Sequence, residues 1–169
     1  MALYRDGKFE SDSWRRLEAD ELPEEGHVLL SLSEWRRFAA GQQNSNVAFG
    51  VVLEPGETAE MIAADLPRLA LVAVSFPKFT DGRGYSTARI LRDRYKFACE
   101  LRAIGDILFD QIQLYGRSGF DSLEIKDAVT IKLLESGRKP VMTHFYQPGE
   151  GPEVKDSKSP WRRLSTSQT

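Results

Sequence analysis

The sequence has little of what holds metals and redox centres. Its 169 residues include one cysteine, Cys99, and two histidines, His27 and His144. A lone cysteine excludes a disulfide or a dithiol exchange within the chain, and it cannot hold an iron–sulfur cluster. The two histidines lie far apart and fit no zinc-binding spacing. We therefore expect no metal site, no iron–sulfur cluster and no haem. Any other cofactor is unknown from the sequence.

Long apolar runs and a strong net charge are also missing. No apolar stretch approaches the roughly 20 residues that a membrane-spanning helix needs. The first residues, MALYRDGKFESDSW, are charged from the fifth onward, which is unlike a signal peptide. A net charge of −2 gives no overall attraction to nucleic acid or to an anionic membrane. We expect a cytoplasmic protein without a nucleic-acid or membrane partner.

Glycine loops typical of nucleotide binding are absent. The stretch GRGYS has two glycines of the dinucleotide pattern but lacks the third, and it follows the third apolar run rather than the first. No GxxxxGK[ST] loop occurs. The common nucleotide cofactors therefore leave no signature in this chain.

What the sequence does contain is a regular alternation of apolar runs and helical patterns. The opening ALYRDGKFESDSW predicts a β-hairpin, because Asp6-Gly7 suits a type I′ turn. Apolar runs then predict strands at 27–32, 46–53, 68–76, 100–105, 120–125 and 140–146. Helices are expected between them, with N-terminal caps at Ser33, Thr58, Ser86 or Thr87, Asp106 and Asp127.

This alternation predicts an α/β fold. The expected architecture is a mostly parallel open sheet with helices on both faces, preceded by the N-terminal β-hairpin. The alternative is an incomplete β/α barrel-like array, since a full eight-fold barrel needs about 250 residues. We expect a single α/β domain over residues 1–147. Residues 148–169, rich in Gly, Pro, Lys, Ser and Thr, are expected to form a mobile tail.

The loop after the third apolar run is the first candidate for a site. Ligands in parallel α/β folds lie beyond the carboxyl ends of the strands, and Pro77–Tyr85 is the longest connection there. Asp81-Gly82 permits a sharp turn, and Gly84 would let a ligand approach the backbone. Arg83 and the amides near Ser86, at an expected helix start, suit a phosphate- or sulfate-like anion. The alternative is a glycine turn with an exposed arginine.

Other charged residues could join this site. Arg102 lies within a predicted strand, so it should reach the sheet's end or meet a carboxylate, with Asp106 and Glu124 as candidates. Asp106 is either a helix cap or part of the site. Glu124, near a strand end, is a candidate general base or arginine partner. Cys99 is expected to be a small buried side chain rather than a nucleophile.

The helix that follows the loop has a polar face. Arg89, Arg92, Asp93 and Lys96 lie opposite its expected apolar stripe. The face is expected to be solvated, and the alternative is a basic docking surface for an acidic partner.

Three stretches resemble a known bacterial family. They are FPKFTDGRGYSTARILRDRY, then ELRAIGDILFDQ after Cys99, then GFDSLEI. The chain is similar, from the hairpin to about Glu135, to uncharacterised proteins described as oxidoreductases involved in sulfite reduction. Their genes lie near those of sulfite reductase and phosphoadenylyl-sulfate reductase.

The resemblance implies a role in sulfate assimilation and cysteine biosynthesis. It adds weight to Asp81, Arg83, Gly84, Tyr85, Arg102 and Asp106, and also to Gly82, Arg89, Arg92, Gly105 and Gln111. It implies sulfite, sulfate or a sulfonucleotide as the anion. Two functions follow: an oxidoreductase or substrate-handling component of sulfite reduction, or a non-catalytic accessory or assembly protein that docks on sulfite reductase. The partner is sulfite reductase or another sulfate-assimilation enzyme.

Overall fold

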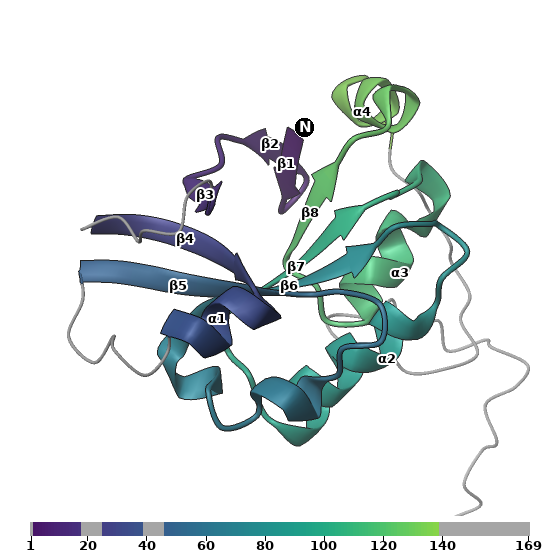
Figure 1. Ribbon diagram of the computed structural model, residues 1–169. Helices are drawn as coiled ribbons and strands as arrows, with labels where there is room; N and C mark the ends of the chain where they lie inside the picture. Colours follow the sequence, from purple (N-terminus) through teal and green to yellow (C-terminus); the bar gives the residue numbers. More distant parts are fainter. Residues whose placement is uncertain (1, 18–24, 39–45, 139–169) are drawn as a thin grey trace, which may run out of the picture.

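The computed structural model describes residues 2–17, 25–38 and 46–138 (Figure 1). The expected last strand at 140–146 and the expected tail from 148 onward lie outside the described residues. Among the described helices, none has both the length and the apolar character required to cross a bilayer.

The N-terminal hairpin is confirmed. Strand β1 (Ala2–Arg5) pairs antiparallel with β2 (Lys8–Glu10). Both turn residues have positive φ, 49° at Asp6 and 82° at Gly7, as a type I′ turn requires. A further short strand, β3 (Trp14–Arg16), follows and had no signal in the sequence.

Five parallel strands form where the apolar runs predicted them. They are β4 (Glu25–Ser31), β5 (Asn46–Leu53), β6 (Leu69–Phe76), β7 (Glu100–Gly105) and β8 (Ser122–Ile125). Together with the N-terminal strands they make one eight-stranded sheet in the order β2-β1-β8-β7-β6-β5-β4-β3. The sheet is mixed, because β1 pairs antiparallel with both β2 and β8, whereas the other pairings are parallel.

The sheet is a curled half-barrel rather than a flat open sheet. Strands β2 and β3 lie at its opposite ends, yet only residues 11–13 separate them in the chain. Four residue steps span at most about 14 Å, so the sheet must curl to bring Glu10 and Trp14 that close. The strands from β4 to β8 also lie side by side in chain order, as in a β/α barrel.

The helices cover one face of the sheet, so the expectation of helices on both faces is wrong. Figure 1 shows α1, α2 and α3 on one side and the N-terminal strands on the other. A strand order that never reverses places successive crossovers of one hand on the same side. The helices are α1 (Leu32–Phe38), α2 (Arg83–Arg89), α3 (Ile112–Arg117) and α4 (Ala128–Glu135).

Shorter helical turns fill the remaining connections. Two 3-10 turns, η2 (Ala59–Ile62) and η3 (Leu66–Arg68), replace the helix expected after Thr58. The π-helical segment η4 (Ile90–Arg94) continues α2, and the 3-10 turn η5 (Phe109–Gln111) precedes α3.

The expected caps differ in their outcome. Asp127 does cap α4, because its side chain accepts a hydrogen bond from the Thr130 amide at 2.6 Å. Ser33 lies inside α1, and Ser31 caps that helix instead through a reciprocal pair with Glu34. Thr58 makes no side-chain cap bond.

The two faces of the sheet have separate cores. The larger cluster joins outward side chains of β4 to β8, such as Val51 and Leu101, to helix residues such as Trp35 and Tyr115. The smaller cluster lies on the inner face: Leu29, Val52, Leu71, Ala73 and Ile104, covered by Trp14.

Candidate functional site

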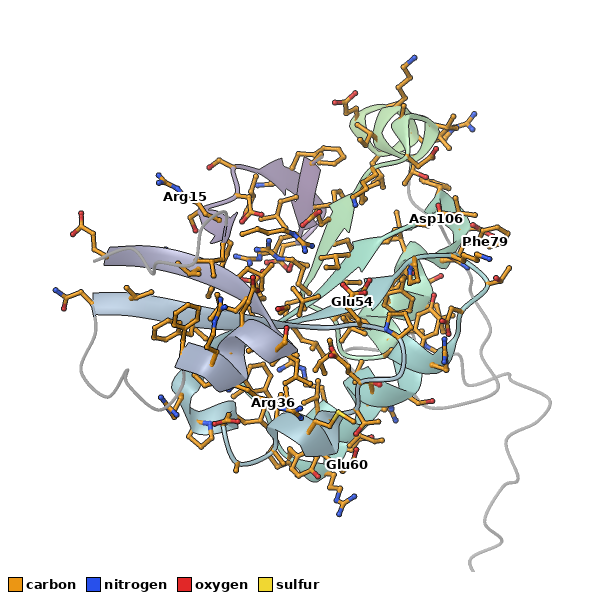
Figure 2. The ribbon with its side chains drawn as sticks, viewed as in Figure 1. Arg15, Arg36, Glu54, Glu60, Phe79 and Asp106 are labelled. Carbon is orange, nitrogen blue, oxygen red and sulfur yellow. The ribbon has the colours of Figure 1, made fainter. Side chains whose placement is uncertain are left out.

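The loop between β6 and α2 is held by its own backbone and by the next β/α connection. The Phe79 amide donates to Asp106 Oδ2 at 3.1 Å, and the Phe79 carbonyl accepts from Gln111 Nε2 at 3.0 Å. Figure 2 shows Asp106 and Phe79 side by side at this edge of the sheet. Asp106 therefore fastens the loop and does not cap a helix, because the next helical turn begins only at Phe109.

Arg83 is an exposed cation whose counter-ion, Asp81, is partly buried. Its side chain is 69% exposed and meets Asp81 through two contacts, at 2.6 and 2.9 Å. The Arg83 guanidinium and the Arg83 amide lower the pKa of Asp81 to about 2, and Asp81 in turn raises the pKa of Arg83. A ligand oxyanion would meet a guanidinium that is already paired, so it would have to replace the Asp81 carboxylate.

Gly84, Tyr85 and Gly105 pack closely around Phe76. A Cβ at Gly84 would lie 2.4 Å from the Phe76 ring, and one at Gly105 would lie 2.3 Å from the Phe76 carbonyl oxygen. Gly84 is therefore required by close contact between helix and strand, so our reading of it as a point of ligand approach finds no support here. The Tyr85 ring packs on Phe76 and Tyr115, with ring centroids 5.1 and 4.9 Å away. Burial raises the pKa of Tyr85 and of Tyr115.

The helix after the loop begins earlier than expected. Its first residue is Arg83, so Ser86 lies within α2 and is exposed. The expectation of a helix start at Ser86 or Thr87 is wrong, because Gly82 already has a helical conformation, with φ −81° and ψ −3°.

The polar face of this helix is only partly solvated. Arg89 bridges to Asp93 at 3.3 Å, as the spacing predicts. Arg92 is instead mostly buried, with 14% of its side chain exposed. It donates to the carbonyls of Phe97, Cys99 and Gly119 and contacts the carboxylate of Asp121 at 2.5 Å. The expectation that Arg92 is solvated is therefore wrong.

A small pocket adjoins Arg83. It has a volume of about 20 Å³, which is room for about one water molecule. Its lining comes from the ends of β5 and β6 and from the start of α2, and includes Glu54, Glu57, Ser75, Asp81 and Arg83. The three carboxylates outnumber the one guanidinium in this lining, which disfavours an anion inside the pocket itself.

Arg102 is buried on the inner face of the sheet and points away from this loop. It is 1% exposed, and its guanidinium contacts Glu100 at 2.9 and 3.0 Å and Asp12 at 2.6 Å. Glu100 begins β7, whereas the loop lies beyond the end of that strand. Arg102 thus meets carboxylates as expected, but Asp106 and Glu124 are not its partners. The prediction that it approaches Arg83 is wrong.

Further residues join Arg102 in a cluster of charged side chains whose net charge is zero. Arg5 contacts Glu100 Oε2 at 2.6 Å, and the Ser122 hydroxyl donates to Glu100 Oε1 at 2.6 Å. Burial by itself raises the pKa of Glu100, but these partners and Arg102 together lower it. We call Arg5, Asp12, Glu100, Arg102 and Ser122 the inner cluster. Two guanidinium groups balance two carboxylates.

Glu124 lies beside the inner cluster but makes no bond to it. It is 8% exposed, and its Oε1 is buried without a hydrogen-bond partner among the described residues. Its cross-strand neighbours are Leu3 on β1 and Ile104 on β7. The structure therefore separates the two carboxylates considered as catalytic candidates: Asp106 lies against the loop, and Glu124 lies on the inner face.

Sequence reasoning missed several of these residues. Arg5 and Asp12 had no signal, because ion-pair partners 90 residues apart, such as Asp12 and Arg102, leave no local pattern. Glu100 did have one, because it lies two residues before Arg102 in the same strand and so on the same face of the sheet. From the sequence, Phe76 is predicted only as part of an apolar strand, and its role as the packing partner of Gly84 and Tyr85 is not. Cys99 is exposed, which contradicts the buried side chain expected. It precedes β7 and so lies at the sheet edge opposite the Arg83 loop.

A larger groove lies at that opposite edge. It has a volume of about 660 Å³ and is lined by residues such as Asp12, Arg15, Glu25, His27 and Asn46. None of the expected site residues contributes to it. Ligands of β/α folds bind at the carboxyl ends of the strands, and this groove lies at their amino ends.

Comparison with known proteins identifies the family. Residues 50–155, more than half of the chain, match DUF934, described as a bacterial protein of unknown function. The chain belongs to this family. No curated protein and no solved structure matches it. The matched region holds the Arg83 loop and Arg102, whereas Arg5, Asp12 and Trp14 lie before it.

Proposed function

We propose that this DUF934 protein is a substrate-handling component of assimilatory sulfite reduction and binds a sulfur oxyanion at Arg83. The pathway rests on the family resemblance of the stretches around Arg83 and Asp106. The binding rests on one observation: Arg83 is an exposed guanidinium on a fastened loop, and its counter-ion, the partly buried side chain of Asp81, lies beside it just before the start of the same helix. An oxyanion can take the place of that carboxylate and accept the same two hydrogen bonds.

Substrate handling suits the geometry better than an oxidoreductase reaction by this chain's own thiol. Cys99 precedes β7, and Arg83 follows the carboxyl end of the neighbouring strand β6. The thiol and the guanidinium therefore lie at opposite edges of the sheet. An oxyanion held by Arg83 is out of reach of the Cys99 sulfur.

Calorimetric titration with sulfite, sulfate and adenosine 5′-phosphosulfate tests the binding. Arg83→Ala should weaken it about ten-fold or more, because charge-assisted hydrogen bonds are lost. Asp81→Asn should strengthen it, because the competing charge is removed. The matched control is Arg94→Ala. Arg94 is 67% exposed and pairs with one carboxylate, that of Glu60, but lies at the far end of the same helical segment. Binding that is absent, or unchanged in Arg83→Ala, would contradict the proposal.

Growth experiments test the pathway separately. A strain that lacks the protein should grow poorly on sulfate or sulfite and recover on sulfide or cysteine. Complementation with Arg83→Ala should fail, and complementation with Arg94→Ala should succeed. Equal growth of the deletion strain on every sulfur source, with no second family member present, would count against the pathway.

A second candidate function is an accessory protein that docks on sulfite reductase. Phe79 favours it, because this residue is 47% exposed while its backbone is held by Asp106 and Gln111. Rigid exposed aromatic side chains are efficient contact residues, since little entropy is lost on binding. Phe79→Ser should weaken binding to purified sulfite reductase. Met61→Ser, at a side chain that is 46% exposed on η2, is the control. Equal binding by the two variants would exclude Phe79 as the contact.

A further inference from the structure

Glu124 stands apart from the other charged residues of the inner face because it has no partner. In the inner cluster, Glu100 contacts both Arg5 and Arg102, and Asp12 supplies the second negative charge. Arg5 Nε is a buried donor that has no hydrogen-bond partner among the described residues, and no contact joins it to Glu124. Of the buried side-chain atoms without a hydrogen-bond partner in the described part of the chain, Glu124 Oε1 is the one carboxylate oxygen.

The register places Glu124 at the carboxyl-end mouth of the curled sheet. Ser75, Ile104, Glu124 and Leu3 form one cross-strand row over β6, β7, β8 and β1. Each of the three parallel strands ends one residue later. Ile104 belongs to the smaller apolar cluster covered by Trp14, so the row faces the inside of the curl. In β/α folds this layer, at the carboxyl ends of the strands, is where ligands are held.

The surroundings define the chemistry that Glu124 can accept. Its neighbours in the row, Leu3 and Ile104, are apolar, and the Ser75 hydroxyl lies two strands away, about 10 Å between backbones. A buried carboxylate without a counter-charge is costly to retain, so a residue in this position is not explained by packing. A positively charged donor would supply both the missing hydrogen bond and the missing charge.

We propose that Glu124 is the binding residue of a second site, at the mouth of the curled sheet, for a small molecule that carries an amine or guanidine cation. The Glu124 carboxylate accepts the cation's hydrogen bonds. The apolar side chains of Leu3 and Ile104 flank the cation's hydrocarbon part. Glu124 is not part of the small pocket beside Arg83, which shares only Ser75 with this row.

Amide chemical shifts in titrations with methylguanidinium and with methylammonium test this site. In the parent protein the amides of Leu3, Ile104 and Ile125 should shift saturably. In Glu124→Gln, a near-isosteric variant, the affinity should fall about ten-fold or more. Glu54→Gln is the control, because Glu54 is exposed at the same edge of the sheet. Tetramethylammonium, which cannot donate a hydrogen bond, should bind more weakly than methylammonium.

Thermal unfolding without ligand gives an independent readout. Glu124→Leu should raise the unfolding midpoint, because an unpaired buried carboxylate is replaced by an apolar side chain of similar size. A lowered midpoint would show that Glu124 supports the fold and would overturn the proposal. The absence of saturable shifts in the parent protein, or equal shifts in Glu124→Gln, would overturn it as well. Neither result bears on anion binding at Arg83.

Discussion

The outer and inner faces of the curled sheet are built from the same alternating strands but are stabilised in different ways. The outer face is a continuous apolar layer beneath helices. The inner face has an apolar half under Trp14 and a charged half around Arg102. Apolar packing tolerates partial loss, whereas a buried charged network does not, since removing one member leaves another uncompensated. The inner face should therefore be the more sensitive to single substitutions.

Removing Arg102 should have the largest effect on stability. Arg102→Ala leaves the carboxylates of Glu100 and Asp12 without their partner and should lower the free energy of unfolding by about 3–5 kcal/mol. Urea denaturation measures this. Arg94→Ala, which removes an exposed guanidinium, should change the free energy of unfolding little. Similar losses in the two variants would show that burial of the inner cluster is not what makes it sensitive.

Two helical glycines test the outer face. Gly84→Ala should lower the free energy of unfolding by about 1–3 kcal/mol, because its Cβ would overlap the Phe76 ring. Gly116→Ala in α3 meets nothing within 4 Å and should raise it by up to about 1 kcal/mol. Denaturation of both variants checks the opposite signs. Equal effects of the two substitutions would mean that the Phe76 ring moves aside at no cost in stability.

Acid should affect the inner face through Glu100, with the smallest of the three effects. Because the folded protein lowers the pKa of Glu100, its stabilising contribution is present above the usual value of 4.5 and is lost as the pH falls through the lowered pKa. Unfolding measurements between neutral pH and pH 3 should show this decline in the parent. In Glu100→Gln the decline should be shallower. An unchanged pH dependence would remove Glu100 as its source.

Strand positions were predictable from the sequence because burial of a strand on both faces leaves a continuous apolar run. The run at 46–53 coincides with β5, and the run at 68–76 coincides with β6 apart from its first residue. The hairpin was predictable from Asp6-Gly7, whose positive φ values few other residue pairs tolerate. The Asp127 cap was predictable because its hydrogen bond is local. At the candidate site, the sequence indicated the Arg83 loop and the contribution of Asp106 from the next connection.

The tertiary structure alone decided how far the sheet curls and what each charge meets. No local pattern records that Asp12 reaches Arg102, since the contact forms only when residues 11–13 join the two ends of the sheet. The role of Gly84 was likewise hidden, because glycine suits both a ligand's approach and the close packing on Phe76. The sequence by itself determined the hairpin and the five parallel strands, whose patterns depend on neighbours along the chain. The curl of the sheet, the inner cluster and the isolation of Glu124 depend on neighbours in space.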